Sequence, residues 1–347
     1  MSSKSNRKHL IIPVFIPFLG CPHKCIYCRQ DKITGQSEAK VRGKDISRLI
    51  EQAKNSKKFK TAHTREVAFY GGTFTSLETE YMKGLLGAVS DCIKLKSIDN
   101  IRISTRPDEI DGERLELLKS FGVTIIELGV QSMNNDVLRK SGRGHTTEET
   151  VAAVSLLKKY GFKIGVQLMP GLPGDSAEIF QDTIDKVIEL APDIARLYPA
   201  IVIKGTGLSK LYKAGKYKPL SLDKAVEICS AGSTRLEQND IKVIRIGLMS
   251  TPSLLEDGEI LAGPWHSAFG FLVRSDMYLK KIIPFLPSPG TTSEIGIRIH
   301  EREIPLLRGY KNIGLKKIEK IGKTKIQYIR PEPHIASGRI EVDIIKW

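Results

Sequence analysis

The sequence lacks any long apolar run and has few cysteines. No stretch approaches the roughly 20 consecutive apolar residues that cross a bilayer, and the N-terminus has no long apolar segment with the cleavage site of a secretory signal. Three of the five cysteines stand close together, which indicates metal binding in a reducing compartment and excludes a disulfide framework. We therefore expect a cytoplasmic protein with no membrane partner.

The chain is long and apolar enough to bury a sizeable core. Its 347 residues are 41% hydrophobic and accommodate one large domain, or one domain with an appendage. The net charge of +15 is uneven: residues 1–60 carry 14 Lys/Arg against 4 Asp/Glu, residues 280–347 carry 14 against 7, and residues 61–279 carry 26 against 28. Basic ends on a near-neutral body suit an anionic polymer as partner; a solvated basic surface without a partner is the alternative.

Cys21, Cys25 and Cys28 form a C-x3-C-x2-C pattern directly after the apolar run 10–18. Three thiolates on one short loop can hold three irons of a 4Fe–4S cube and leave the fourth iron without a protein ligand. That open iron is where a cofactor or substrate can bind.

A structural zinc site is the alternative use of these cysteines. Zinc normally takes four protein ligands, which arrive as two separated pairs. The other cysteines, Cys92 and Cys229, each stand alone in a helix-like stretch, and His23 lies within the triplet, where the short loop makes simultaneous ligation awkward. The ligand count therefore favours the cluster.

With Tyr27 directly before the third cysteine, the pattern resembles that of the radical S-adenosylmethionine (radical SAM) superfamily, and the resemblance implies that Tyr27 contacts S-adenosylmethionine. The resemblance implies that the open iron binds the amino and carboxylate groups of S-adenosylmethionine. It further implies that an electron, supplied by a donor such as ferredoxin or flavodoxin, cleaves this cofactor to methionine and a 5′-deoxyadenosyl radical, which takes hydrogen from a substrate. The protein would supply orientation and exclusion of water.

Short β-branched or aromatic runs alternate with amphipathic helical stretches. Six such units predict an α/β fold with parallel strands joined by right-handed crossovers, and the resemblance implies a partial (βα)6 barrel of the TIM type. Capping boxes, Thr75 with Glu78 and Thr146 with Glu149, predict two helix starts. The expected strands are residues 10–18, 66–70, 101–104, 124–130, 163–168 and 194–202, and the expected helices are residues 45–59, 78–95, 113–121, 147–160, 177–190 and 222–238.

Every expected strand has a polar or glycine-rich signature at or near its end. The carboxyl ends of parallel barrel strands line one face, and that face carries the active site. We therefore expect the signatures to meet in one site. They are the cysteine loop, Gly71-Gly72-Thr73, Thr105-Arg106-Pro107-Asp108, Gln131-Ser132, Pro170-Gly171-Leu172-Pro173-Gly174 and Tyr198-Pro199.

Gly71-Gly72-Thr73 resembles the two-glycine motif of the superfamily, which meets the methionine amino group because only glycine lets the backbone approach a ligand so closely. The usual third residue is acidic. The run 127–132, with Arg143 twelve residues after Gln131, closely resembles the oxygen-independent coproporphyrinogen III dehydrogenase family and the radical SAM domain of the Elongator catalytic subunit. That resemblance implies that Gln131 contacts the adenosyl ribose and that Arg143 binds the methionine carboxylate.

Two positions depart from these relatives. Gln167 stands where the porphyrinogen enzymes tend to have an aspartate that contacts the ribose hydroxyls, and it can still hydrogen-bond them. Ser104 stands where the Elongator relatives have a glutamate. Both departures concern the fine geometry of nucleoside binding. Three further residues can face a substrate but more often have structural roles: His145, Trp265 and His266.

Residues 196–208 resemble the sixth-strand segment of the Elongator catalytic subunit, whose reaction modifies the wobble uridine of tRNA. The resemblance covers residues 10–285 and does not extend to that subunit's acetyltransferase domain, so its reaction is not assumed. Together with the basic ends, it points to tRNA or another RNA as substrate. A porphyrinogen-related enzyme, or a haem-binding or trafficking protein, is the alternative.

The expected domain organisation has three parts. Residues 1–9 are a basic tail, residues 10–289 the barrel with a following strand (241–246) and helix (267–285), and residues 290–347 a small α+β appendage. Prolines and a glycine in residues 287–292 mark the boundary. The expected appendage elements are strands at 294–300, 324–329 and 339–345 and a helix at 315–321.

Overall fold

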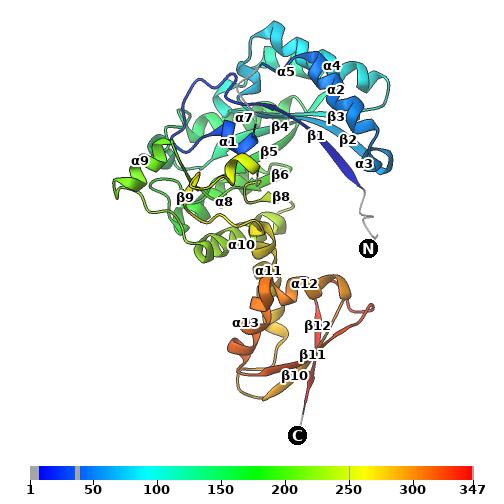
Figure 1. Cartoon of the computed structure of the whole chain (residues 1–347), viewed down its shortest axis with the longest axis vertical. Helices are drawn as coiled ribbons and strands as arrows, with labels where there is room; N and C mark the ends of the chain where they lie inside the picture. The colour runs from blue at the N-terminus through cyan, green and yellow to red at the C-terminus, as the bar shows by residue number, and fades with distance from the viewer. Residues whose placement is uncertain (1–7, 36–39, 250, 346–347) are drawn as a thin grey trace.

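The computed structural model describes residues 8–35, 40–249 and 251–345. Its main sheet has the order β1-β2-β3-β4-β5-β6-β8, with every neighbouring pair parallel. Figure 1 shows this sheet curled into a partial barrel. Residues 1–7 of the expected tail lie outside the described residues. The strands are β1 (His9–Ile16), β2 (Thr64–Gly71), β3 (Asn100–Thr105), β4 (Val123–Gln131), β5 (Lys163–Leu168), β6 (Ile194–Leu197) and β8 (Lys242–Ile246).

Helices connect successive strands and cover the outside of the sheet (Figure 1). The predicted partial barrel is confirmed, and β8 adds one more parallel strand beside β6. The connecting helices are α2 (Gly43–Lys54), α3 (Lys57–Thr61), α4 (Thr79–Lys94), α5 (Gly112–Ser120), α7 (Thr147–Lys159), α8 (Ala177–Leu190) and α10 (Leu222–Gln238); shorter ones are α1 (Gln30–Thr34), α6 (Asn135–Lys140) and α9 (Gly207–Lys213).

Alternation along β4 shows how the sequence positions the site. Ile126 and Val130 belong to the apolar core of the barrel, whereas Glu127, Gly129 and Gln131 line a cavity. Successive side chains of a strand point to opposite faces, so one strand serves both core and cavity. Each fully buried Ile or Val of this core contributes about 1.5–3 kcal/mol relative to exposure.

One of the two predicted capping boxes is confirmed. The Thr146 hydroxyl accepts a hydrogen bond from the Glu149 backbone N–H, and the Glu149 side chain accepts one from the Thr146 N–H. The box at Thr75 is wrong, because α4 begins at Thr79 with no side-chain cap. Thr75 is buried in a short 3-10 turn, and its hydroxyl pairs with that of Thr105 instead.

Two predicted elements are each divided in the structure. The expected strand 194–202 ends at Leu197, and β7 (Val202–Ile203) pairs antiparallel with β9 (Ile260–Ala262). Pro199 explains the break, because proline has no N–H to donate to a sheet. The expected helix 45–59 divides into α2 and α3, where the Ser56 hydroxyl accepts from the Phe59 N–H and starts a new helix.

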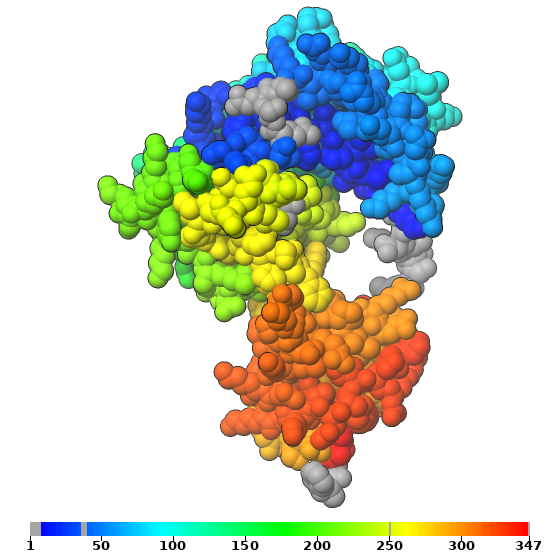
Figure 2. All heavy atoms as spheres, in the orientation of Figure 1, coloured from blue at the N-terminus to red at the C-terminus, as the bar shows by residue number. Residues whose placement is uncertain are grey.

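The C-terminal part has a small sheet of its own, in the order β11-β10-β12. Its apolar core includes Ile295, Ile297 and Ile299 and takes Tyr278 and Ile282 from α11. Figure 2 shows this part as a lobe beyond the barrel. The boundary at 287–292 stays a prediction. The elements are α11 (Phe269–Ile282), β10 (Glu294–Ile299), α12 (Ile304–Arg308), α13 (Ile313–Gly322), β11 (Lys325–Pro331) and β12 (Ile340–Ile344).

Candidate functional site

A cavity of about 430 Å³ opens at the carboxyl ends of the barrel strands. The cysteine loop after β1 forms part of its wall, and the carboxyl ends of β2, β3, β4 and β5, with residues that follow β2, β3 and α6, contribute the rest. All the residues predicted to bind a cluster or S-adenosylmethionine line this cavity, and their roles stay predictions. They are Cys21, Cys25, Cys28, Tyr27, Gly71, Gly72, Thr73, Ser104, Gln131, Arg143 and Gln167.

The two-glycine segment is fastened to the turn that leads into the cysteine loop. The Thr73 N–H donates to the Leu19 carbonyl at 2.8 Å, and the Gly72 N–H donates to the Ile16 carbonyl at 2.9 Å. A Cβ on Gly72 would lie 1.9 Å from the Leu19 carbonyl oxygen. The close contact between the two loops therefore already requires glycine here, before any ligand is considered.

Gln30, which the sequence analysis missed, joins the same two loops. Its amide nitrogen donates to the Gly71 carbonyl at 3.0 Å, and its amide oxygen accepts from the Phe18 N–H. Gln30 also lines the cavity. A single glutamine after a cysteine motif carries no sequence signal of its own, so only the fold reveals this role.

The three thiols share one wall of the cavity and interact with polar neighbours. The Thr73 hydroxyl lies 3.5 Å from Cys21 Sγ, and Arg143 Nη1 lies 3.5 Å from Cys25 Sγ. Burial, together with the nearby thiols of Cys25 and Cys21, raises the pKa of Cys28 to about 12. Three crowded thiolates would therefore need a positively charged centre between them.

This donor set fits an iron–sulfur cube better than a single ion. Within residues 8–35, 40–249 and 251–345, no three His, Cys, Asp or Glu side chains converge as ligands of one metal ion. A zinc ion needs such convergence. A cube does not, because each thiolate binds a different iron.

Arg143 is buried and held in place from two sides. Its Nε and Nη2 donate to the Gly129 carbonyl at 3.2 and 2.7 Å, while Nη1 faces Cys25. A Cβ on Gly129 would lie 2.7 Å from Nη2, so any larger residue here would displace the guanidinium. An arginine has five N–H donors, and these contacts leave donors for a carboxylate in the cavity.

Gln131 adopts an unusual backbone conformation at the end of β4. Its φ is +67°, in the left-handed region that side chains other than glycine rarely occupy. The β4–β5 register shifts between Leu128 and Gln131, and the Gln167 side-chain amide donates to the Gln131 side-chain oxygen at 3.2 Å. Such a conformation costs about 1–3 kcal/mol and is typical of functional sites. The two glutamines predicted to contact the nucleoside are therefore partners.

A buried charged network lies below this cavity inside the barrel. Arg102 on β3 pairs with Glu66 at 2.6 Å and with Glu127. Arg196 on β6 donates to Glu127 at 3.0 Å and to the Tyr70 hydroxyl at 2.8 Å. Glu127 also lines the cavity. These charges fix the relative positions of four strands beneath the site, a role that sequence reasoning missed.

The remaining candidates lie elsewhere. His145 is buried and does not line the cavity, and burial with the nearby Arg143 lowers its pKa to about 3, so it stays neutral. Trp265 lies beside other grooves. Cys92 lies on α4 and Cys229 on α10, as expected of ordinary helix cysteines.

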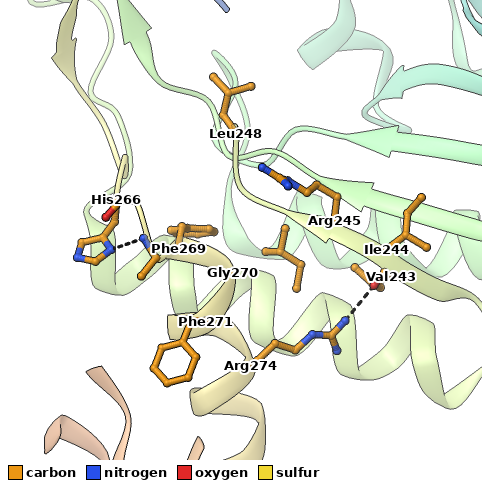
Figure 3. A pocket seen from close by; sticks show the side chains of 12 residues that line it. Val243, Ile244, Arg245, Leu248, His266, Phe269, Gly270, Phe271 and Arg274 are labelled. Atoms are coloured by element: carbon orange, nitrogen blue, oxygen red, sulfur yellow. Dashed lines mark hydrogen bonds between the residues drawn. The ribbon is translucent and has the colours of Figure 1, made fainter. Parts of the chain in front are cut away.

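His266 has a structural role. It lies in a separate hollow of about 390 Å³ beside β8 and α11, which Figure 3 shows. Its Nδ1 accepts from the Ala268 N–H at 3.0 Å, and its ring meets the edge of Tyr310 at 4.8 Å between centroids. It therefore joins the start of α11 to the C-terminal lobe.

The curled parallel sheet, with a three-cysteine loop after its first strand and polar groups at its other strand ends, defines a barrel enzyme with its cofactor site at the carboxyl face. Residues 15–187 match the model of the Radical SAM superfamily, and residues 192–279 match that of the Radical SAM C-terminal domain. The chain belongs to the radical SAM superfamily. Members of this family use a 4Fe–4S cluster and S-adenosylmethionine.

The relatives are Elongator-like, as predicted. The tRNA uridine(34) acetyltransferase of Methanocaldococcus jannaschii is 33% identical over 247 residues, covering 60% of this chain and 46% of its own. Human Elongator complex protein 3 is 33% identical over 183 residues, covering 47% and 34%. The structure of Elp3 from Methanocaldococcus infernus superposes with a TM-score of 0.64 at 25% identity, covering 79% and 63%. The chain spans about half the length of the acetyltransferase and about a third of the length of the human protein.

Proposed function

We propose that this radical SAM enzyme holds a 4Fe–4S cluster on Cys21, Cys25 and Cys28, binds S-adenosylmethionine in the adjoining cavity and acts on RNA, with tRNA as the first candidate. One observation supports this most: the three thiols and the eight predicted S-adenosylmethionine contacts line the same cavity of about 430 Å³. When bound, the cluster and S-adenosylmethionine supply the radical chemistry.

The side chains of the cavity divide into two groups. Arg143, next to Cys25, would bind the carboxylate of the methionine moiety, and the backbone of Gly71 and Gly72 would face its amino group. Thr73 replaces the usual acidic residue, and its hydroxyl points at Cys21. We therefore expect the backbone of this segment to make the amino-group contact.

The second group would position the nucleoside. Gln131 and Gln167 are hydrogen-bonded to each other, and Ser104 lines the cavity with them. An amide pair can donate to and accept from the two ribose hydroxyls. Tyr27, half-buried against apolar side chains, would exclude water from the cluster side.

The substrate class rests on the relatives and on charge. The acetyltransferase of Methanocaldococcus jannaschii is named for tRNA uridine 34. Because the chain covers 46% of that protein, acetyl transfer is not carried over. The net charge of +15 suits a polyanion. No helix of the described residues is long and apolar enough to cross a membrane, and a reducing cytoplasm would suit the cysteines.

The test is anaerobic turnover of the reconstituted protein with S-adenosylmethionine, reduced flavodoxin or ferredoxin, and unmodified tRNA. We expect 5′-deoxyadenosine, formed faster with tRNA, and a mass change in one tRNA nucleotide. Cys28→Ala should abolish both. Absence of 5′-deoxyadenosine under all conditions would refute the proposed radical SAM activity. If a porphyrinogen but not RNA stimulates cleavage of S-adenosylmethionine, the proposed RNA substrate is refuted.

A further inference from the structure

A lysine-rich segment adjoins the cysteine loop. Between Asp193 and Asp223 the chain has no Asp or Glu but has five lysines. These lysines lie directly after β7, on α9 and in the loop that follows α9. We call the five lysines and the exposed Tyr212 the α9 platform: Lys204, Lys210, Tyr212, Lys213, Lys216 and Lys218.

The lysines of the α9 platform are free to bind a partner. All five are exposed, and within the described part of the chain none of their ammonium groups has a hydrogen-bond or ion-pair partner. Many other surface lysines pair with a carboxylate, as Lys83 does with Glu80 and Lys224 with Glu227. Unpaired like charges on one helix repel each other, and a bound polyanion would relieve that repulsion.

The platform is attached to the cysteine loop by the backbone. The Leu208 N–H donates to the Ile26 carbonyl at 2.7 Å, and Arg29 Nη1 donates to the Lys204 carbonyl at 3.0 Å. A Cβ on Gly207 would lie 3.0 Å from Ile26 Cβ. Figure 1 shows α9 on the same side of the barrel as α1 and the cysteine loop. A partner bound to α9 is therefore held beside the cavity.

The far end of the platform borders a hollow of about 460 Å³. Lys140, Lys216 and Lys218 line it, as does the loop 171–175 after β5. Asp175 also lines it, but its two oxygens accept from the backbone N–H groups of Gly171 and Ser176. The Tyr217 hydroxyl donates to the Gly171 carbonyl at 2.6 Å and fixes this end. Three lysines around one hollow suit a phosphate group.

One aromatic side chain favours RNA over a membrane or an acidic protein. Tyr212, 37% exposed, stands on α9 between Lys210 and Lys213. A lysine groove with an exposed aromatic ring is typical of single-stranded nucleic-acid binding, where bases stack on the ring and phosphates meet the lysines. A base that reaches the cavity must be unstacked, so the flanking nucleotides are single-stranded as well.

We propose that the α9 platform binds the backbone of a single-stranded RNA segment and presents the neighbouring nucleotide to the cavity. This inference rests on the proposed RNA substrate and locates its binding surface. It also differs from the expectation based on the basic chain ends. Lys57, Lys58 and Lys60 lie on α3, directly before β2, and therefore at the amino edge of the sheet, opposite the cavity.

The experiment compares two triple variants of equal charge change in the holoenzyme. The platform variant is Lys210→Gln, Lys213→Gln and Lys216→Gln, and the control is Lys57→Gln, Lys58→Gln and Lys60→Gln. Binding of an anticodon stem-loop RNA is measured across salt concentrations. We expect the platform variant to bind the RNA about tenfold to hundredfold more weakly at about 0.1 M salt. The slope of log affinity against log salt concentration should become shallower by about 2. The control should change little.

Further measurements distinguish a wrong binding surface from a wrong substrate class. Tyr212→Ala should weaken stem-loop binding about fivefold to a hundredfold, while 5′-deoxyadenosine formation without RNA stays unchanged in all variants. Equal losses of RNA affinity in the two triple variants, or no loss in the platform variant, would overturn the α9 platform as the binding surface. RNA binding by the wild type would still support the proposed substrate class in that case. If wild type binds no RNA, the substrate class itself fails. Platform-dependent binding to phosphatidylserine vesicles in place of RNA would also overturn the inference.

Discussion

Arg143 Nη1 lies 3.5 Å from the Sγ of Cys25. The side chain predicted to bind the methionine carboxylate thus touches a predicted cluster ligand. A guanidinium in this position can neutralise thiolate charge and bind an anionic group of the cofactor at the same time. The predicted cluster site and the predicted S-adenosylmethionine site therefore adjoin each other.

Arg143→Ala and Gln131→Ala should keep the cluster but weaken S-adenosylmethionine binding. Neither residue is an iron ligand, so iron content should survive the substitutions. Loss of a carboxylate-bound arginine costs about 1.5–3 kcal/mol, or roughly ten- to hundredfold in affinity. Equilibrium binding of S-adenosylmethionine to the reconstituted variants measures the effect.

Arg139→Ala is the matched control, because Arg139 is 71% exposed and pairs with Asp136 on the surface. Its affinity should equal that of the wild type. Wild-type affinity in both Arg143→Ala and Gln131→Ala would show that the nucleoside pocket lies elsewhere.

Gly72→Ala should disrupt the cysteine loop. The added Cβ would lie 1.9 Å from the Leu19 carbonyl oxygen, and backbone must move to admit it. We expect reduced cluster content and a loss of stability above about 2 kcal/mol. Gly84→Ala on α4, where a Cβ meets nothing within 4 Å, should instead stabilise by about 0.5–1 kcal/mol. Denaturant unfolding and iron content compare the two, and a neutral Gly72→Ala would contradict the described loop contact.

Arg102→Met should be strongly destabilising. It leaves the buried Glu66 without its arginine and Glu127 with Arg196 as its remaining arginine. An uncompensated buried charge costs about 3–5 kcal/mol. Arg114→Met is the control, since Arg114 is 40% exposed in its pair with Asp111 and should cost about 0–1 kcal/mol. Similar unfolding free energies for the two variants would contradict a structural role for the network.

His145 predicts a pH dependence of stability. Burial and the neighbouring Arg143 lower its pKa to about 3, below the ordinary value of 6.5. The folded protein therefore keeps the ring neutral, and the unfolded chain takes up a proton first as the pH falls. This contribution is fully present above pH 6.5 and is lost towards pH 3, at up to about 1.4 kcal/mol per pH unit.

The measurement is the unfolding free energy of wild type and His145→Gln between pH 7.5 and about 4.5. The unfolding free energy of wild type should fall relative to that of His145→Gln as the pH drops below about 6.5. A constant difference would show that the His145 pKa is not lowered in the folded protein.

Sequence reasoning found the barrel and many of the cavity residues because both follow from local signals, but two signatures expected in the same site, residues 170–174 and 198–199, do not line the cavity. Strand ends in parallel barrels share one face, so signatures such as Gly71-Gly72-Thr73 could be placed together. It missed Gln30 and the Glu127 network, because their partners are distant in sequence. The positive φ of Gln131 carries no sequence signal.

The α9 platform was not predicted, because charge was summed over residues 61–279 as one block. Residues 61–279 were nearly neutral as a block, yet residues 194–222 hold five lysines and no acidic residue. Net charge summed over windows of about 30 residues would have revealed this cluster of lysines. The division of the sixth strand was also readable, since Pro199 stands inside the expected run.

Iron and acid-labile sulfide analysis of the anaerobically purified chain tests the central claim most directly. If Cys21, Cys25 and Cys28 hold a cube, the wild type carries about four iron and four sulfide per chain, and replacing any of the three by Ala loses them. About one zinc and no sulfide per chain would contradict the account.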